Sequence, residues 1–268
     1  MLPCYALDHV RSVEFYHSAV KILETASVPF LVGGAFALRT YTGIDRDTKD
    51  FDVMMKPADV PRALEAFRQA GFAAAVAFPH WLAKARHGEF FIDIIFRAGN
   101  GLCEVDDDWF RYAPTAEIFG QQLPICPAEE IIWQKAYIME RERFDGADVQ
   151  HLLLSRGAEL DWPRLLARFG PDWRVLLSHL VLFGFVYPSE REAIPESVLQ
   201  CLYAKLSEER GAAPSGRICG GTLLSRTQYL PDVERWRFAD ARLDGRARVT
   251  VDELQVWTNA IDRSECVD

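Results

Sequence analysis

The chain has 268 residues, of which 49% are hydrophobic and 12% are aromatic, and its 30 lysines and arginines against 39 aspartates and glutamates give a net charge of −9. This apolar content is enough for a sizeable core, which excludes a wholly disordered chain. Glycine and proline usage is close to average, which excludes collagen-like and low-complexity classes. An acidic chain attracts nucleic acid poorly in bulk, although a local basic patch is compatible with it.

The sequence predicts no membrane segment and no secretion signal. The longest apolar run, around 175–186, is interrupted by Ser178 and His179 and falls short of the ~20 residues of a membrane helix. No basic stretch followed by an apolar core opens the chain, so we expect no signal peptide. Six scattered cysteines without a C-x-x-C pair indicate free thiols in a reducing compartment. We therefore expect a cytoplasmic protein.

The first 125 residues mix predicted helices and strands. Apolar spacing predicts helices over 8–26, 35–41 and 58–70, with Gly71 closing the last one. Runs rich in β-branched and aromatic residues predict strands, whereas polar, turn-rich stretches predict loops. The predicted strands cover 28–32, 50–55, 72–78 and 89–96, with two short strands around Gly120 within 116–125; the predicted loops cover 42–49 and the region of His80, Trp81 and His87.

From Pro127 onward the pattern becomes helical. The predicted helices cover 128–142, 145–155, 162–169, 172–186, 195–208 and, near the end of the chain, 249–261. A loop or linker is predicted at 209–217. Because the strands are followed by a run of helices, we expect an α+β protein with a domain at 1–125, a helical domain at 126–208 and a C-terminal extension at 209–268.

The most informative stretch is 31–52, LVGGAFALRTYTGIDRDTKDFD. Gly33 and Gly34 follow a predicted strand and precede a predicted helix. Two glycines allow a tight turn with close backbone approach, and the first turn of a helix offers free N–H groups to a phosphate.

Three aspartates complete the pattern. Asp50 and Asp52 are two residues apart on a predicted strand, so both carboxylates point the same way while Phe51 points into the core. Two such carboxylates repel one another unless a cation lies between them, and Mg²⁺ prefers oxygen ligands. Asp93 is alone in the apolar strand FFIDIIF, where burial is costly unless a cation or hydrogen bonds compensate it. We expect this strand to lie beside the first one, so that the three acids hold two Mg²⁺ ions roughly 3.5–4 Å apart.

The sequence resembles the DNA polymerase β-type nucleotidyltransferase superfamily in one motif, which consists of Gly33-Gly34, then Asp50-x-Asp52, then Asp93. Within this superfamily, GGAFALRTYTGIDRDTKDFDV is similar to the bacterial minimal nucleotidyltransferase branch, which includes antibiotic nucleotidyltransferases and abortive-infection-type toxins. The resemblance is specific over about 28–55 and weaker up to Leu154. It implies a small mixed sheet flanked by helices, then a helical domain. It also implies that the glycines contact the triphosphate and that Asp50, Asp52 and Asp93 bind the metals.

A second match lies in the helical half. Lys135 falls where toxin-like members carry a lysine followed by a D-x-x-D element, here Asp145 and Asp148. By this resemblance Lys135 offsets triphosphate charge, as a point cation does. Asp148, or else Asp145, orients the acceptor hydroxyl or holds a contact between helices. Arg46, in the loop before the acids, is a further candidate for phosphate or acceptor binding.

The sequence therefore predicts a Mg²⁺-dependent enzyme. We expect it to transfer a nucleoside monophosphate from an NTP, such as ATP, to an acceptor and to release pyrophosphate. The acidic charge favours a small-molecule acceptor; a tRNA 3′ end or a protein side chain, as in toxin-like relatives, stays open. The alternative is a catalytically inactive protein of the same fold that binds nucleotide or a partner as a regulator.

Overall fold

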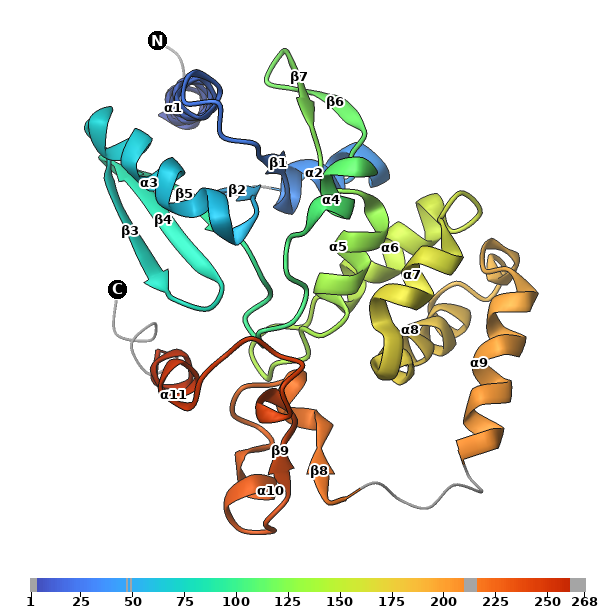
Figure 1. Cartoon of the computed structure of the whole chain (residues 1–268). Coiled ribbons are helices and arrows are strands. Elements are labelled where there is room, and N and C mark those ends of the chain that lie inside the picture. Colours follow the sequence, from blue (N-terminus) through green and yellow to red (C-terminus); the bar gives the residue numbers. More distant parts are fainter. Residues whose placement is uncertain (1–3, 47, 49, 210–215, 261–268) are drawn as a thin grey trace. The chain divides into compact units, whose positions relative to one another are not determined.

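The computed structural model describes residues 4–46, 48, 50–209 and 216–260 (Figure 1). The chain divides into two compact units. The first contains Met1–Gly99 and Glu104–Pro127, and the second contains Asn100–Cys103 and Ala128–Asp268. The three-part division expected from the sequence stays a prediction.

A five-stranded mixed sheet forms the centre of the first unit, in the order β1-β2-β5-β4-β3. Neighbouring strands are antiparallel except β2 and β5, which run parallel. This confirms the α+β class with a small mixed sheet. The strands are β1 (Leu31–Val32), β2 (Asp50–Met54), β3 (Ala73–Phe78), β4 (Leu82–His87) and β5 (Phe90–Ile95).

Helices α1 (Cys4–Thr25) and α3 (Val60–Gln69) cover one face of this sheet. The covered face carries Phe51 and Ile92, both fully buried, and the Tyr16 ring of α1 packs 5.0 Å from the Phe51 ring. Helix α3 buries four apolar residues at helical spacing, namely Val60, Ala63, Leu64 and Phe67. Since side chains alternate along a strand, Asp50, Asp52 and Asp93 belong to the opposite face.

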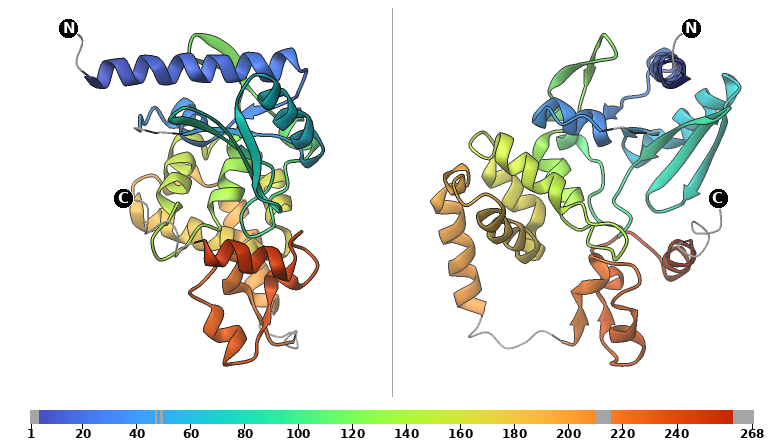
Figure 2. Two further views of the ribbon diagram at one scale, coloured as in Figure 1. Left: turned by 90° about the vertical axis from the view of Figure 1, so that its left-hand side faces the viewer. Right: turned by 180° about the vertical axis from the view of Figure 1, so that it is seen from behind.

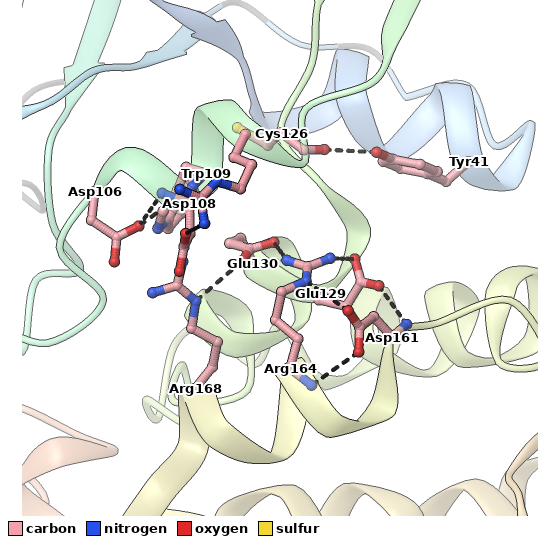
Figure 3. Close-up of polar contacts among 11 residues, drawn as sticks. Tyr41, Asp106, Asp108, Trp109, Cys126, Glu129, Glu130, Asp161, Arg164 and Arg168 are labelled. Carbon is pink, nitrogen blue, oxygen red and sulfur yellow. Dashed lines mark hydrogen bonds and ion pairs between the residues drawn. The ribbon is translucent and has the colours of Figure 1, made fainter.

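Helix α2 (Gly34–Thr42) follows β1 directly and ends at Gly43, which adopts the left-handed conformation of a helix stop. The Tyr41 hydroxyl donates a hydrogen bond to the carbonyl of Cys126 at 2.8 Å (Figure 3). This bond fixes the end of α2 to the chain that follows the hairpin β6 (Thr115–Ile118) and β7 (Gln121–Pro124), which protrudes from the unit (Figure 2). Short helix α4 (Asp107–Arg111) is capped by Asp106.

The second unit is mainly helical. Its helices are α5 (Ala128–Lys135), α6 (Gly146–Arg156), α7 (Trp162–Phe169), α8 (Trp173–Val186) and α9 (Glu196–Glu209). Arg164 of α7 pairs with Glu129 and Glu130 of α5, and Glu130 is fully buried (Figure 3). A buried carboxylate requires such a partner, so this pairing fixes α7 against α5.

The C-terminal segment packs on the second unit. It contains β8 (Ile218–Cys219), α10 (Leu230–Glu234), β9 (Ala239–Asp240) and α11 (Val251–Asn259), and α11 begins with a capping box made by Thr250 and Glu253. The buried amide of Asn100 donates to the carbonyl of Leu223 at 2.9 Å. None of the described helices combines the length and apolar character that a membrane crossing requires.

The structure corrects two predicted elements. Residues 82–87 form β4, between β5 and β3, so His87 does not lie in a loop. His80 is in a turn but buried, 3.0 Å from the carbonyl of Gly99. The helix predicted over 128–142 ends at Lys135. Beyond it the chain turns back, and the amide of Met139 bonds to the carbonyl of Leu224.

Candidate active site

Three aspartates meet on the face of the sheet opposite α1 and α3. In the parallel pairing of β2 and β5, Asp52 stands directly opposite Asp93, and Asp50 stands opposite Phe91. One carboxylate oxygen from each of Asp50, Asp52 and Asp93 lies within 4.8 Å of the others, and all three side chains are partly exposed. The expected adjacency of the two strands, and the burial of Phe51 behind them, are confirmed.

The three carboxylates oppose one another electrostatically. Burial raises the pKa of Asp93, and the nearby charge of Asp50 adds to that rise, whereas Lys84 lowers it. The Lys84 ammonium lies 2.7 Å from Asp93 Oδ1. Asp50 accepts a hydrogen bond from the Thr48 hydroxyl, which holds its carboxylate in place. A cluster of this kind gains stability from any cation that enters it.

The donor set fits a hard divalent ion. It consists only of carboxylate oxygens, and these are spaced closely enough to share an ion. Mg²⁺ prefers such oxygens and keeps further positions for water and phosphate. The residues present therefore fit a magnesium site.

Gly34 brings the start of α2 against this cluster. Its φ is +52°, a conformation that favours glycine, and a Cβ at this position would overlap the Asp52 carboxylate. The amide of Gly33 donates to the carbonyl of Asp52 at 2.9 Å, which ties the turn to β2. The N–H groups of the first turn of α2, which have no partner within the helix, therefore start beside Asp52, and this arrangement would suit a phosphate.

The pKa of Tyr16, on the covered face of the sheet, is affected by the charge of the site. Its hydroxyl is buried and has no hydrogen-bond partner among the described residues. Burial raises its pKa to about 12, and the negative charges of Asp50 and Asp52 contribute to the rise. The charges of Asp50 and Asp52 therefore reach the covered face of the sheet.

The structure places the other candidates in two locations. Arg46 is exposed in the loop between α2 and β2, four residues before Asp50. In the second unit, the Lys135 ammonium lies 2.6 Å from Asp145 and 2.8 Å from Asp148. The three residues of the lysine and D-x-x-D match thus form one cluster, in which Asp145 also binds Arg143.

Asp145 is held firmly in its charged form. Burial acts to raise its pKa, but the hydrogen bonds and charges of Arg143 and Lys135 outweigh burial and lower the pKa to about 2. Lys135 therefore has its charge balanced by the two acids of its own unit. The roles of Lys135, Asp145, Asp148 and Arg46 toward a nucleotide stay predictions.

Sequence reasoning missed Lys84, which contacts Asp93, and with it Arg86 on the same face of β4. The segment LAKARH carries its cations at every second position. That alternation is the signal that could have indicated a strand with one cationic face.

Comparisons with known proteins give structural matches only. No family model matches the chain, and no curated protein does. Among solved structures, the antibiotic-resistance factor ANT(2″)-Ia in solution is similar, with a TM-score of 0.44 and 17% identity over 63% of this chain and 97% of that one. Its complex with adenylyl-2″-tobramycin matches with a TM-score of 0.38 and 15% identity, over 65% and 98%. The lincomycin-bound lincosamide antibiotic adenylyltransferase LnuA matches with a TM-score of 0.38 and 15% identity, over 52% and 94%.

These matched proteins are nucleotidyltransferases, the class that the sequence motif resembles. Identities this low, with TM-scores below 0.5, do not carry a function to this chain.

Proposed function

We propose that the chain is a nucleotidyltransferase that moves a nucleoside monophosphate from an NTP to a small-molecule acceptor and releases pyrophosphate. One observation carries this proposal: three carboxylates from two adjacent parallel strands converge within 4.8 Å, next to the glycine turn that opens α2. The first part suits divalent ions, and the second suits a polyphosphate.

In this proposal Asp50, Asp52 and Asp93 hold two Mg²⁺ ions. Ions held by these carboxylates would neutralise charge at the attacking oxygen and at the leaving pyrophosphate. The chain itself orients the reactants. The glycine turn and the start of α2 bind phosphate oxygens with backbone N–H groups, and Lys84 offsets part of the charge of Asp93. Positioning and electrostatic stabilisation are the main sources of rate acceleration in such a site.

We also propose that Lys135 contributes to nucleotide binding, as its resemblance implies. The pairing with Asp145 and Asp148 supports a fixed position for its ammonium group, because two carboxylates bind it at 2.6 and 2.8 Å. A lysine held in this way can present its remaining N–H donor to a phosphate. We propose a similar phosphate or acceptor contact for Arg46.

The test is a transfer assay with NTPs labelled at the α-phosphate, offered with pools of small molecules, total RNA and protein. We expect Mg²⁺-dependent labelling with release of pyrophosphate. The Asp52→Asn variant should be at least about 100-fold slower, because it removes a carboxylate from the ions. Asp107→Asn is the matched control, since this aspartate is exposed and, among the described residues, its ion pair is with Lys56 at the surface.

Two results would count against the proposal. Wild-type protein that binds an NTP but releases no pyrophosphate with any acceptor would favour the inactive, regulatory alternative. Wild-type protein that binds no NTP in the presence of Mg²⁺ would refute both nucleotide readings.

A further inference from the structure

A basic hollow lies at the edge strand β3 and its neighbour β4, and Lys84 places it beside the acid cluster. It encloses about 530 Å³ over β3 and β4, a volume in the usual range for small-ligand sites. Its floor is made of small side chains, chiefly Ala73, Ala75 and Ala77. Arg68, Lys84 and Arg86 line it, and no carboxylate does so among the described residues. A cationic hollow is unexpected in a chain with a net charge of −9.

The strand register connects this hollow to the catalytic acids. Along one row across the sheet, Asp52 stands opposite Asp93, Asp93 opposite Lys84, and Lys84 opposite Ala75. Lys84 thus borders both the acid cluster and the hollow. Adjacent strands are roughly 4.8 Å apart, so a group over β3 lies about 10 Å from Asp93. One small molecule can span that distance.

Arg86 is the cation best placed to bind a ligand. It is exposed, it stands opposite Phe91, and its guanidinium lies 5.3 Å from the centre of that ring. The same ring carries the Lys84 ammonium at 4.6 Å. Among the described residues no carboxylate pairs with Arg86, whereas Lys84 is bound to Asp93. Arg68 is held at the edge of the sheet by its bond to the carbonyl of Ala74.

We propose that this hollow binds the acceptor, and that the acceptor is a small molecule with a phosphate group. Its hydroxyl would lie at Asp93 and its phosphate at Arg86, whose fork of N–H donors matches phosphate oxygens. This rests on the proposed function.

Calorimetry with ribose 5-phosphate tests this proposal, with ribose as the uncharged probe and a short single-stranded RNA as the competing source of phosphate. Each is titrated into the full chain with and without Mg²⁺ and a non-hydrolysable ATP analogue, so that the nucleotide site can be filled first. We expect ribose 5-phosphate to bind under both conditions and ribose not to bind. Arg86→Gln should weaken that binding about tenfold or more. Arg86 is chosen because it forms no ion pair with the three acids among the described residues, although its charge acts on Asp93 from a distance. Binding of the ATP analogue should therefore change much less than binding of ribose 5-phosphate.

Lys21→Gln is the control, since it removes an exposed positive charge from α1, on the covered side of the sheet. Equal binding of ribose 5-phosphate by wild type and Arg86→Gln, or no binding by wild type, overturns the proposal. The proposal is also overturned if the RNA binds and ribose 5-phosphate does not. If only the ATP analogue fails to bind, the proposed function fails while the anion site stands.

Discussion

At the scale of single residues, the contact between Gly34 and Asp52 determines the geometry of the site. Gly34 has a positive φ and leaves no room for a Cβ, because the Asp52 carboxylate fills that space. The turn and the acid are thus two parts of one arrangement. A glycine is required here for both its backbone conformation and its lack of a side chain.

Replacing Gly34 by alanine should therefore damage the site and not only the turn. The positive φ costs an alanine about 1–2 kcal/mol, and the overlap with Asp52 must be relieved by moving the carboxylate. We expect lower stability to urea together with at least about tenfold weaker binding of Mg²⁺ and a non-hydrolysable NTP.

Gly43→Ala provides the matched control. Gly43 has a φ of +70° with nothing within 4 Å of a Cβ, so the variant should lose a similar backbone energy while NTP binding is kept. Equal NTP binding by the two variants would contradict the role given to Gly34.

At the scale of secondary structure, the sequence predicted the elements that carry the acids. The strands at 50–55 and 89–96 and the helices around 35–41 and 58–70 agree with β2, β5, α2 and α3. Their patterns are strong because each buries one apolar face, as Phe51 and Ile92 show. The adjacency of β2 and β5 could be predicted because burying the Asp93 carboxylate alone in an apolar strand costs free energy, and a neighbouring cation site offsets that cost.

The elements that were missed have weak local signals. Strand β4 contains two cations and three small or polar residues among six, so its hydrophobic alternation is faint; its pairing on both sides with β3 and β5 makes it a strand. The segment after Lys135 contains good helix formers. It turns instead, and the amide of Met139 donates a hydrogen bond to the carbonyl of Leu224. These residues are 85 positions apart in the sequence, so no local pattern reveals the contact.

The cluster that joins α5 and α6 makes a pH-dependent prediction. Asp145 has its pKa lowered from 3.8 to about 2, so the folded chain releases this proton more readily than the unfolded chain. Its stabilisation is complete above about pH 4 and is lost as the pH falls toward 2. Asp145→Asn should thus lower the free energy of unfolding by about 2 kcal/mol at pH 7, and by about half of that at pH 3.

Urea titrations of both proteins at pH 7 and pH 3 measure this difference. Glu159→Gln is a suitable control in the same unit, because Glu159 is exposed and its pair with Arg156 contributes little. A wild-type advantage over Asp145→Asn that is equal at both pH values would contradict the assigned cause.

At the scale of the whole molecule, the C-terminal segment belongs to the helical unit. Glu140 is bound by Ser225 and Arg226, and Asn100 is bound to the carbonyl of Leu223. These contacts involve buried polar groups, which are costly to leave unpaired. The segment after residue 209 is therefore expected to stabilise the second unit.

A chain shortened after residue 209 should expose those groups and lose about 3 kcal/mol or more of stability in the second unit. Hydrogen exchange should show faster exchange in α5 and α6, with the amides of β2, β4 and β5 in the first unit unchanged. Arg226→Gln should give a smaller effect in the same helices. Unchanged exchange in α5 and α6 after truncation would contradict this role.

The central claim is that Asp50, Asp52 and Asp93 together bind divalent ions, and binding of Mn²⁺ as a paramagnetic substitute for Mg²⁺ tests it most directly. In the presence of a non-hydrolysable NTP, wild-type protein should bind two ions per chain. Asp52→Asn and Asp93→Asn should each bind them at least about tenfold more weakly, while Asp107→Asn behaves as wild type. Variants of the three acids that bind Mn²⁺ as tightly as wild type would contradict the account.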